Sequence, residues 1–130
     1  MVAMPLLTPA ELELMAVLWR VPAATVQELC DALGDGRAYT TVATIAHILE
    51  QKGFARSERE GRRLRYAAAV RREDYERTSV SDLFRRVFGG DGALLVRRLV
   101  EAEGLREGEA AELRALLAAA EARGGRGGAS

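Results

Sequence analysis

The pattern Thr-X-X-Glu occurs twice in this chain, at residues 8–11 and 25–28, and each copy precedes a short apolar pattern. A threonine at a helix N-cap and a glutamate three residues later form a capping box, which satisfies two backbone N–H groups at the start of a helix. In the first copy Pro9 stands at the first helical position, where proline is favoured. Two short helices are therefore expected, one beginning after Thr8 and one after Thr25.

A third short helix is expected directly after these two. The apolar patterns that follow the capping boxes stop at Val21-Pro22 and at Gly34-Asp35-Gly36. Helical spacing resumes at Ala38 or Tyr39 and continues to Lys52, after which Gly53 provides a stop. Three short helices with a tight turn before the third predict a helix-turn-helix arrangement.

A β-hairpin is expected after the third helix. Residues 54–58 and 64–69 flank a charged turn that contains Gly61. A helix-turn-helix followed by a hairpin is the winged-helix plan, so the expected fold class is mainly α with a small β-hairpin wing. The hairpin carries five arginines, which are Arg56, Arg59, Arg62, Arg63 and Arg65.

Three further helices are expected over residues 72–88, 92–103 and 106–122, with a disordered tail over 123–130. These helices are rich in Leu, Val and Phe but lie beyond a complete winged-helix core, so we expect them to bury their apolar faces against a second copy. The expected organisation is a winged-helix DNA-binding domain over 6–70 and a helical dimerisation region over 71–122. The expected interface residues are Tyr75, Leu83, Phe84, Val87, Phe88, Leu94, Leu95, Leu99, Leu113, Leu116 and Leu117.

The charge distribution indicates where DNA would bind. The net charge is zero, but five acids accompany one base between residues 8 and 35, whereas seven bases accompany three acids between residues 37 and 66. A basic segment between acidic flanks is the footprint of a DNA-facing surface. In the same segment the outer stripe of the third helix is polar and almost uncharged, and consists of Thr40, Thr44, His47 and Gln51, flanked by Tyr39 and Thr41.

Enzymatic and metal chemistry have little support. The chain has one histidine and one cysteine, Cys30, which lies on an apolar helix face, and it has no paired carboxylates in a Gly-rich turn. We therefore expect no enzyme activity, no metal and no cofactor. No apolar run approaches the ~20 residues of a membrane-spanning helix, and no signal peptide is recognised, so a cytoplasmic protein without a membrane partner is expected.

Three stretches resemble the BlaI/MecI-type penicillinase repressors, in the same order along the chain. The first is residues 7–15 (LTPAELELM) with Leu18-Trp19, and the second is residues 38–42 (AYTTV) followed by 49–54 (LEQKGF). The third is Phe88-Gly89-Gly90, followed by a Leu/Val-rich helix and residues 109–117. The resemblance implies a winged-helix domain, a helical dimerisation region, and repression through an inverted-repeat operator in double-stranded DNA.

The resemblance also implies roles for individual residues. Members of this family read the major groove with the third helix, which places Tyr39, Thr40, Thr41, Thr44 and His47 at the bases. By the same correspondence Arg37 and Lys52 lie near phosphates, and Arg62, Arg63 and Arg65 occupy basic wing positions, beside which the hairpin adds Arg59.

The sequence departs from the family pattern in places that affect function. A long polar pair is common late in the reading helix, where this chain has Ala46-His47, so its operator preference differs. Some members are inactivated by proteolysis at an Asn-Phe bond in the fifth helix, and the resemblance places the corresponding cleavage position at Arg98-Leu99. Because this bond departs from Asn-Phe, it argues against a shared protease and a β-lactam signal, and release by proteolysis or by a small-molecule inducer both stay open. The Cys-X-Cys motif of the copper-responsive branch is absent from the sequence.

Two other functions are compatible with a winged helix. One is a regulator that senses a small-molecule inducer among its C-terminal helices, although the low aromatic content (5%) argues against a large apolar ligand. The other is a protein-interaction module that does not bind DNA, which has no need for five arginines in one hairpin.

Overall fold

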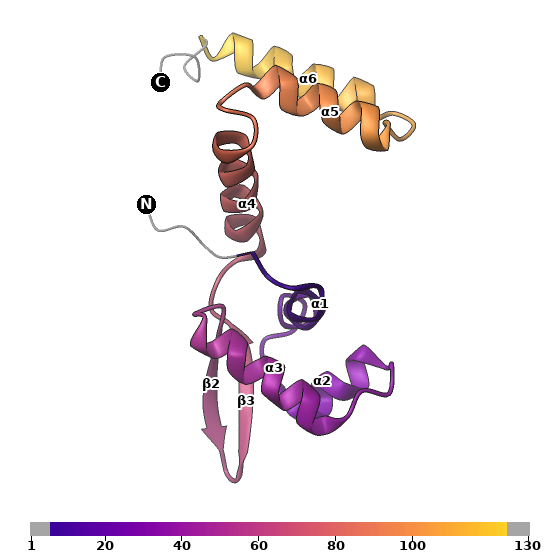
Figure 1. The fold of residues 1–130 in the computed structure, drawn as a ribbon. Coiled ribbons are helices and arrows are strands. Elements are labelled where there is room, and N and C mark those ends of the chain that lie inside the picture. The colour runs from indigo at the N-terminus through magenta and orange to yellow at the C-terminus, as the bar shows by residue number, and fades with distance from the viewer. Residues whose placement is uncertain (1–5, 125–130) are drawn as a thin grey trace. The chain divides into compact units, whose positions relative to one another are not determined.

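The computed structural model describes residues 6–124, which divide into two compact units, residues 6–83 and 84–124 (Figure 1). The division falls within α4 (Arg72–Arg86). The first unit has the winged-helix order α1, β1, α2, α3, β2, β3, and ends with most of α4. The predicted tail lies, from residue 125 on, outside the described residues.

The three predicted short helices are present, and both capping boxes are formed. They are α1 (Pro9–Leu18), α2 (Val26–Leu33) and α3 (Tyr39–Gln51). The Thr8 backbone N–H donates to Glu11 Oε1 at 2.9 Å, and the Glu11 N–H donates to Thr8 Oγ1 at 3.2 Å. Thr25 and Glu28 repeat this arrangement with the same two distances. Gly34 ends α2 in the left-handed conformation (φ 64°), which a glycine adopts without steric cost.

The wing is a hairpin within a three-stranded antiparallel sheet of order β1-β3-β2. Strand β2 (Ala55–Glu60) pairs with β3 (Arg63–Ala68), and Gly61 makes the turn at φ 65°. The hairpin was predicted with boundaries that differ by one or two residues. Strand β1 (Ala24–Thr25), which lies between the first two predicted helices, was not predicted. Its two residues pair with Tyr66 and Arg65 of β3.

The core of the first unit lies between the helices and the sheet. Leu14, Leu29 and Leu49, one from each of the three helices, are completely buried. Phe54, at the start of the hairpin, packs edge-on against Tyr75 of α4, with 5.6 Å between the ring centroids. This packing brings the first turns of α4 into the winged-helix core.

The second unit consists of the end of α4, α5 (Gly92–Glu103) and α6 (Glu109–Ala122). Two boundaries differ from the prediction, since α4 ends at Arg86 rather than Phe88, and α6 begins at Glu109 rather than Arg106. Among the described residues 84–124 none is buried. No helix in the described part of the chain is long and apolar enough to cross a membrane.

Candidate nucleic-acid interface

The outer face of α3 is exposed and nearly uncharged. Its exposed side chains are Tyr39, Thr40, Thr41, Thr44, His47 and Gln51. The opposite face carries Val42, Ala46 and Leu49, which are completely buried and fix the rotation of the helix. The exposed Thr44 donates its hydroxyl proton to the Thr40 carbonyl at 2.9 Å, so its oxygen remains as an acceptor.

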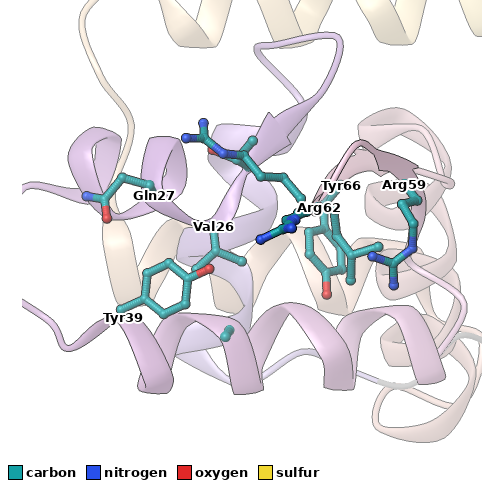
Figure 2. Close-up of a pocket in the computed structure, with 10 residues that line it drawn as sticks. Val26, Gln27, Tyr39, Arg59, Arg62 and Tyr66 are labelled. Atoms are coloured by element: carbon teal, nitrogen blue, oxygen red, sulfur yellow. The ribbon is translucent and has the colours of Figure 1, made fainter.

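A groove of about 520 Å³ separates α3 from the hairpin (Figure 2). The start of α2 contributes Gln27, α3 contributes Tyr39, and the hairpin contributes Arg59, Arg62 and Arg63. Figure 2 shows Tyr39, Arg59 and Arg62 around the same groove. The structure therefore places Tyr39, at the start of α3, and three hairpin arginines around one concave surface, an arrangement compatible with contact to a nucleic-acid backbone.

These three hairpin arginines differ from the other predicted bases in their partners. Among the described residues, Arg59, Arg62 and Arg63 have no ion pair or side-chain hydrogen bond, and all three are exposed. Arg56, nearer the base of the hairpin, donates to the Ala68 carbonyl at 2.8 Å. The cations available to an incoming phosphate are thus concentrated toward the tip of the hairpin.

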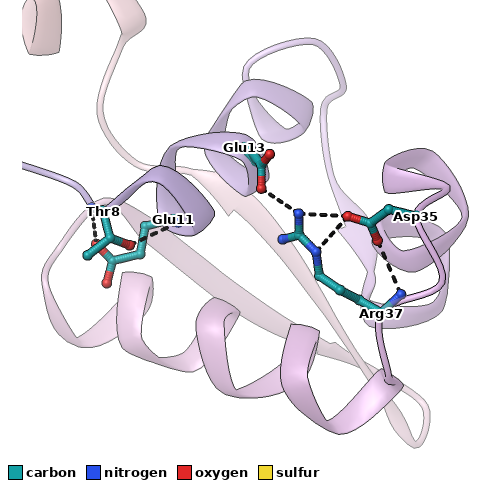
Figure 3. A network of polar contacts seen from close by, with 5 residues as sticks. All are labelled: Thr8, Glu11, Glu13, Asp35 and Arg37. Atoms are coloured by element: carbon teal, nitrogen blue, oxygen red, sulfur yellow. Dashed lines mark hydrogen bonds and ion pairs between the residues drawn. The ribbon is translucent and has the colours of Figure 1, made fainter.

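Arg37 is held by two carboxylates (Figure 3). Its guanidinium pairs with Glu13 of α1, and its Nε donates to Asp35 Oδ2 at 2.7 Å. The Arg37 backbone N–H also donates to Asp35 Oδ1 at 3.1 Å. These contacts fasten the turn between α2 and α3 to α1, so the structure gives Arg37 a scaffold role that the sequence did not predict.

Lys52 and Arg65 are also paired. Lys52 Nζ lies 2.9 Å from both carboxylate oxygens of Glu11. Arg65 Nε donates to Glu60 at 2.6 Å, and its Nη1 donates to Glu28 at 3.1 Å. Lys52 was predicted to lie near phosphates, and Arg65 was predicted to be a basic wing residue. In the structure the side chains of both are bound by carboxylates.

The pKa shifts agree with these pairings. Burial opposes ionisation of Glu11, but the hydrogen bond from the Thr8 backbone and the contact with Lys52 outweigh it and lower the pKa of Glu11. The Thr25 backbone N–H and Arg65 lower the pKa of Glu28 in the same way. The hydrogen bond to Glu13 raises the pKa of Arg37. All these groups are therefore charged at neutral pH.

Tyr75 is the one predicted interface residue that belongs to the winged-helix core. Its side chain is buried, and its hydroxyl accepts a hydrogen bond from the Leu7 N–H at 3.0 Å. Trp19, whose indole N–H donates to the Val70 carbonyl at 2.8 Å, packs beside it. We therefore remove Tyr75 from the proposed dimer surface, because packing and a hydrogen bond already occupy it.

The other predicted interface residues remain accessible in the described structure. Leu83, Val87, Leu99, Leu116 and Leu117 are between 44% and 66% exposed. The half-buried members are Phe84, Phe88, Leu94, Leu95 and Leu113. The position that corresponds to the family's cleavage site, Arg98-Leu99, lies within α5, where Arg98 pairs with Glu101 at 2.9 Å.

Sequence reasoning missed several residues that shape this surface. Gln27 lines the groove, and Glu50 accepts a hydrogen bond from the Ser57 hydroxyl at 2.7 Å, which links α3 to the hairpin. Glu11 and Glu28, which bind Lys52 and Arg65, were recognised from the capping pattern only as parts of helix caps. The capping pattern depends on residues three positions apart, so it could not predict that each glutamate also binds a base distant in the sequence.

Comparisons with known proteins give relatives in sequence and in structure. An uncharacterized 16.5 kDa protein in the ptsI 3′ region of Latilactobacillus sakei is 28% identical over 115 residues, which cover 87% of this chain and 79% of that protein. The solution structure of the DNA binding domain of the repressor BlaI is similar with a TM-score of 0.51 and 28% identity, covering 58% of this chain and 94% of that domain.

The sequence profile of the penicillinase repressor family matches residues 7–119. The match extends through both compact units and confirms the resemblance identified from the three sequence stretches. The mainly helical fold with a small antiparallel wing is the one expected from that resemblance. Because the match covers most of its length, the chain belongs to the penicillinase repressor family.

Proposed function

We propose that the chain is a homodimeric, sequence-specific repressor that places α3 in the major groove of an inverted-repeat operator and the wing on the backbone or in the minor groove. Its family makes it a DNA-binding transcriptional regulator. The observation that carries the finer proposal is the groove that Tyr39, at the start of the exposed and nearly uncharged face of α3, shares with Arg59, Arg62 and Arg63.

The exposed groups of α3 suit base and phosphate contacts. A threonine methyl group such as that of the exposed Thr44 can pack against a thymine methyl, and His47 can donate to the N7 or O6 edge of a purine. Ala38, the N-cap of α3, makes no side-chain cap, so the first backbone N–H groups of the helix are available to phosphate oxygens. Thr40 and Thr41 lie in the same first turn and can donate hydroxyl protons there.

The second unit supports the homodimer. None of its described residues is buried, although it carries a series of leucines, valines and phenylalanines. Helices with apolar faces and no core gain stability by packing against another chain, and a twofold partner is the commonest solution. A twofold dimer presents its two α3 helices to half-sites one DNA turn apart or a multiple of it, about 34–36 Å per turn.

The proposal is tested with the purified chain and fluorescein-labelled DNA taken from directly upstream of its own gene. Fluorescence anisotropy over a salt series, with a scrambled duplex as control, should give tight and salt-sensitive binding of two subunits per site. Thr44→Ala and His47→Ala should change which operator variants are preferred while binding to scrambled DNA stays the same. Failure to bind either duplex at low salt would refute the proposal and favour a protein-interaction role.

A further inference from the structure

The glutamates of the two capping boxes each have a second partner. In both cases this partner is a basic side chain from α3 or the hairpin, the elements proposed to contact DNA. Glu11 caps α1 through the Thr8 N–H and also binds Lys52, the residue that ends α3. Glu28 caps α2 through the Thr25 N–H and also binds Arg65 of β3. The same carboxylate oxygen, Oε1, accepts both contacts in each case.

We propose that Lys52 and Arg65 act in DNA binding as positioning residues, with Glu11 holding the end of α3 and Glu28 holding the wing, and that neither base neutralises a phosphate. This inference rests on the proposed DNA-binding function. It reverses the expectation from the family resemblance, which places Lys52 near phosphates and Arg65 at a basic wing position.

Burial makes the Glu11–Lys52 pair difficult to open. The Glu11 side chain is only 8% exposed, and Lys52 supplies the cation for both of its oxygens. Moving Lys52 onto a phosphate would leave a buried carboxylate without its counter-ion, which is strongly unfavourable. The pair joins Lys52, the C-cap residue of α3, to the first turn of α1, so it fixes the position of α3 in the scaffold.

Arg65 is held in a more exposed but more extensive set of contacts. Glu60 and Glu28 bind it from two sides, at 2.6 and 3.1 Å. Thr25, whose hydroxyl and N–H complete the capping box with Glu28, is also the residue that pairs with Arg65 in the sheet. The strand pairing of Thr25 with Arg65, the capping box of α2 and the ion pair between Glu28 and Arg65 therefore share the same residues and join the wing to α2. With two acids around one guanidinium, this group of residues has no net positive charge to offer a phosphate.

Glutamine substitutions distinguish a positioning role from a phosphate contact, because the two roles predict opposite changes in the affinity for DNA. Glu11→Gln and Glu28→Gln keep a side chain that can complete a capping box, because glutamine serves that position as glutamate does. They remove the ion pair and also remove a negative charge near DNA. If Lys52 and Arg65 contacted phosphates, both variants would free a cation and bind DNA more tightly. Positioning predicts weaker binding, by roughly threefold or more for the buried Glu11 pair.

Glu58→Gln is the matched control. Glu58 lies on the exposed part of β2 and has no ion pair or hydrogen bond through its side chain among the described residues. This variant removes one negative charge from the hairpin without breaking a contact, so it should bind DNA equally or slightly more tightly. Weaker binding by the two capping-box variants and not by this control would support positioning.

The salt dependence gives a second, independent measurement. Each base that leaves a phosphate makes the log–log salt slope less steep by about 0.9, hence by about 1.8 in a dimer. Lys52→Gln and Arg65→Gln should lower affinity with the slope unchanged, whereas Arg63→Gln should flatten it. A flattened slope for Lys52→Gln or Arg65→Gln would overturn the assignment for that residue.

Amide hydrogen exchange of the free protein tests the same contacts without DNA. Glu11→Gln should speed exchange at the end of α3, and Glu28→Gln should speed it in β3, while Glu58→Gln should leave both unchanged. Unchanged exchange in the first two variants would overturn the inference even if DNA binding were altered. Absence of DNA binding by the unmodified chain would instead refute the proposed function, and the exchange data would still show whether the glutamates hold these elements.

Discussion

The wing arginines provide the sharpest quantitative prediction. Arg59, Arg62 and Arg63 are the predicted DNA-contacting bases that have no carboxylate partner among the described residues. Three such bases in each subunit of a dimer predict a log–log salt slope on the order of −5, at about 0.9 per phosphate. The double variant Arg62→Gln/Arg63→Gln removes two of the three, so the slope should fall to about −2. At 0.1 M salt this corresponds to a loss of affinity of about 10³- to 10⁴-fold.

Fluorescence anisotropy over a series of KCl concentrations from about 0.05 to about 0.3 M gives both the affinity for DNA and the log–log salt slope. The control is Arg71→Gln/Arg77→Gln, which removes the same charge from Arg71, just before α4, and from Arg77 within it. The two side chains are 71% and 74% exposed and, among the described residues, pair only with nearby acids, Glu73 and Asp74. The control should leave the slope within the error of the unmodified chain. A wing variant that kept the original slope, or a control that flattened it equally, would show that binding follows net charge rather than the arrangement of the wing.

Three further predictions concern stability and assembly. Leu29→Ala, at a completely buried position, should lower the free energy of unfolding by about 2–5 kcal/mol in urea titrations; a loss below about 1 kcal/mol would show that the core is looser than the packing indicates. Leu116→Glu/Leu117→Glu should give monomers in sedimentation velocity, whereas Leu12→Glu, at an exposed position of α1, should stay dimeric; intact dimers of the double variant would remove α6 from the interface. Because the pKa of Glu11 is lowered in the folded chain, its ionised form stabilises the fold above the ordinary glutamate pKa of 4.5, and that stability is lost as the pH falls through the lowered value. Glu11→Gln should therefore flatten the acid side of the stability–pH curve, and an unchanged acid side would contradict the pairing with Lys52.

Local signals in the sequence were sufficient for most of the first unit. The two Thr-X-X-Glu boxes and the glycines after α2 and α3 determine helix ends through contacts within a few residues, so they can be recognised without the fold. Strand β1 could not be recognised in this way. It has only two residues, and its partners in β3 are about forty residues away in the chain. A segment this short becomes a strand because of its tertiary neighbours rather than its own composition.

The start of α6 shows a different reason for a wrong boundary. We expected the helix from Arg106, but the Arg106 N–H donates to the Glu109 carboxylate at 2.9 Å, and Gly108 adopts φ 83° before the helix begins. Residues 106–108 therefore form a turn that precedes the helix. The carboxylate three residues ahead resembles that of a capping box, but without a Ser or Thr the pattern could not be distinguished from ordinary helical charge spacing.

Where DNA binds stays a prediction, but the structure changes which of the predicted bases remain unpaired. The segment from residue 37 to 66 contains seven bases and three acids, and this is the pattern from which the DNA-facing surface was predicted. The acids that bind Arg37, Lys52 and Arg65, however, include Glu13, Glu11 and Glu28, which precede that segment in the sequence. A count by segment treats these charges as separate, whereas folding places them within hydrogen-bonding distance. The charge available to DNA is therefore set by which bases the scaffold leaves unpaired, and in this chain those bases are near the tip of the wing. The electrostatic contribution to DNA binding should therefore follow the three unpaired arginines, while the paired bases should affect binding through the positions of α3 and the hairpin.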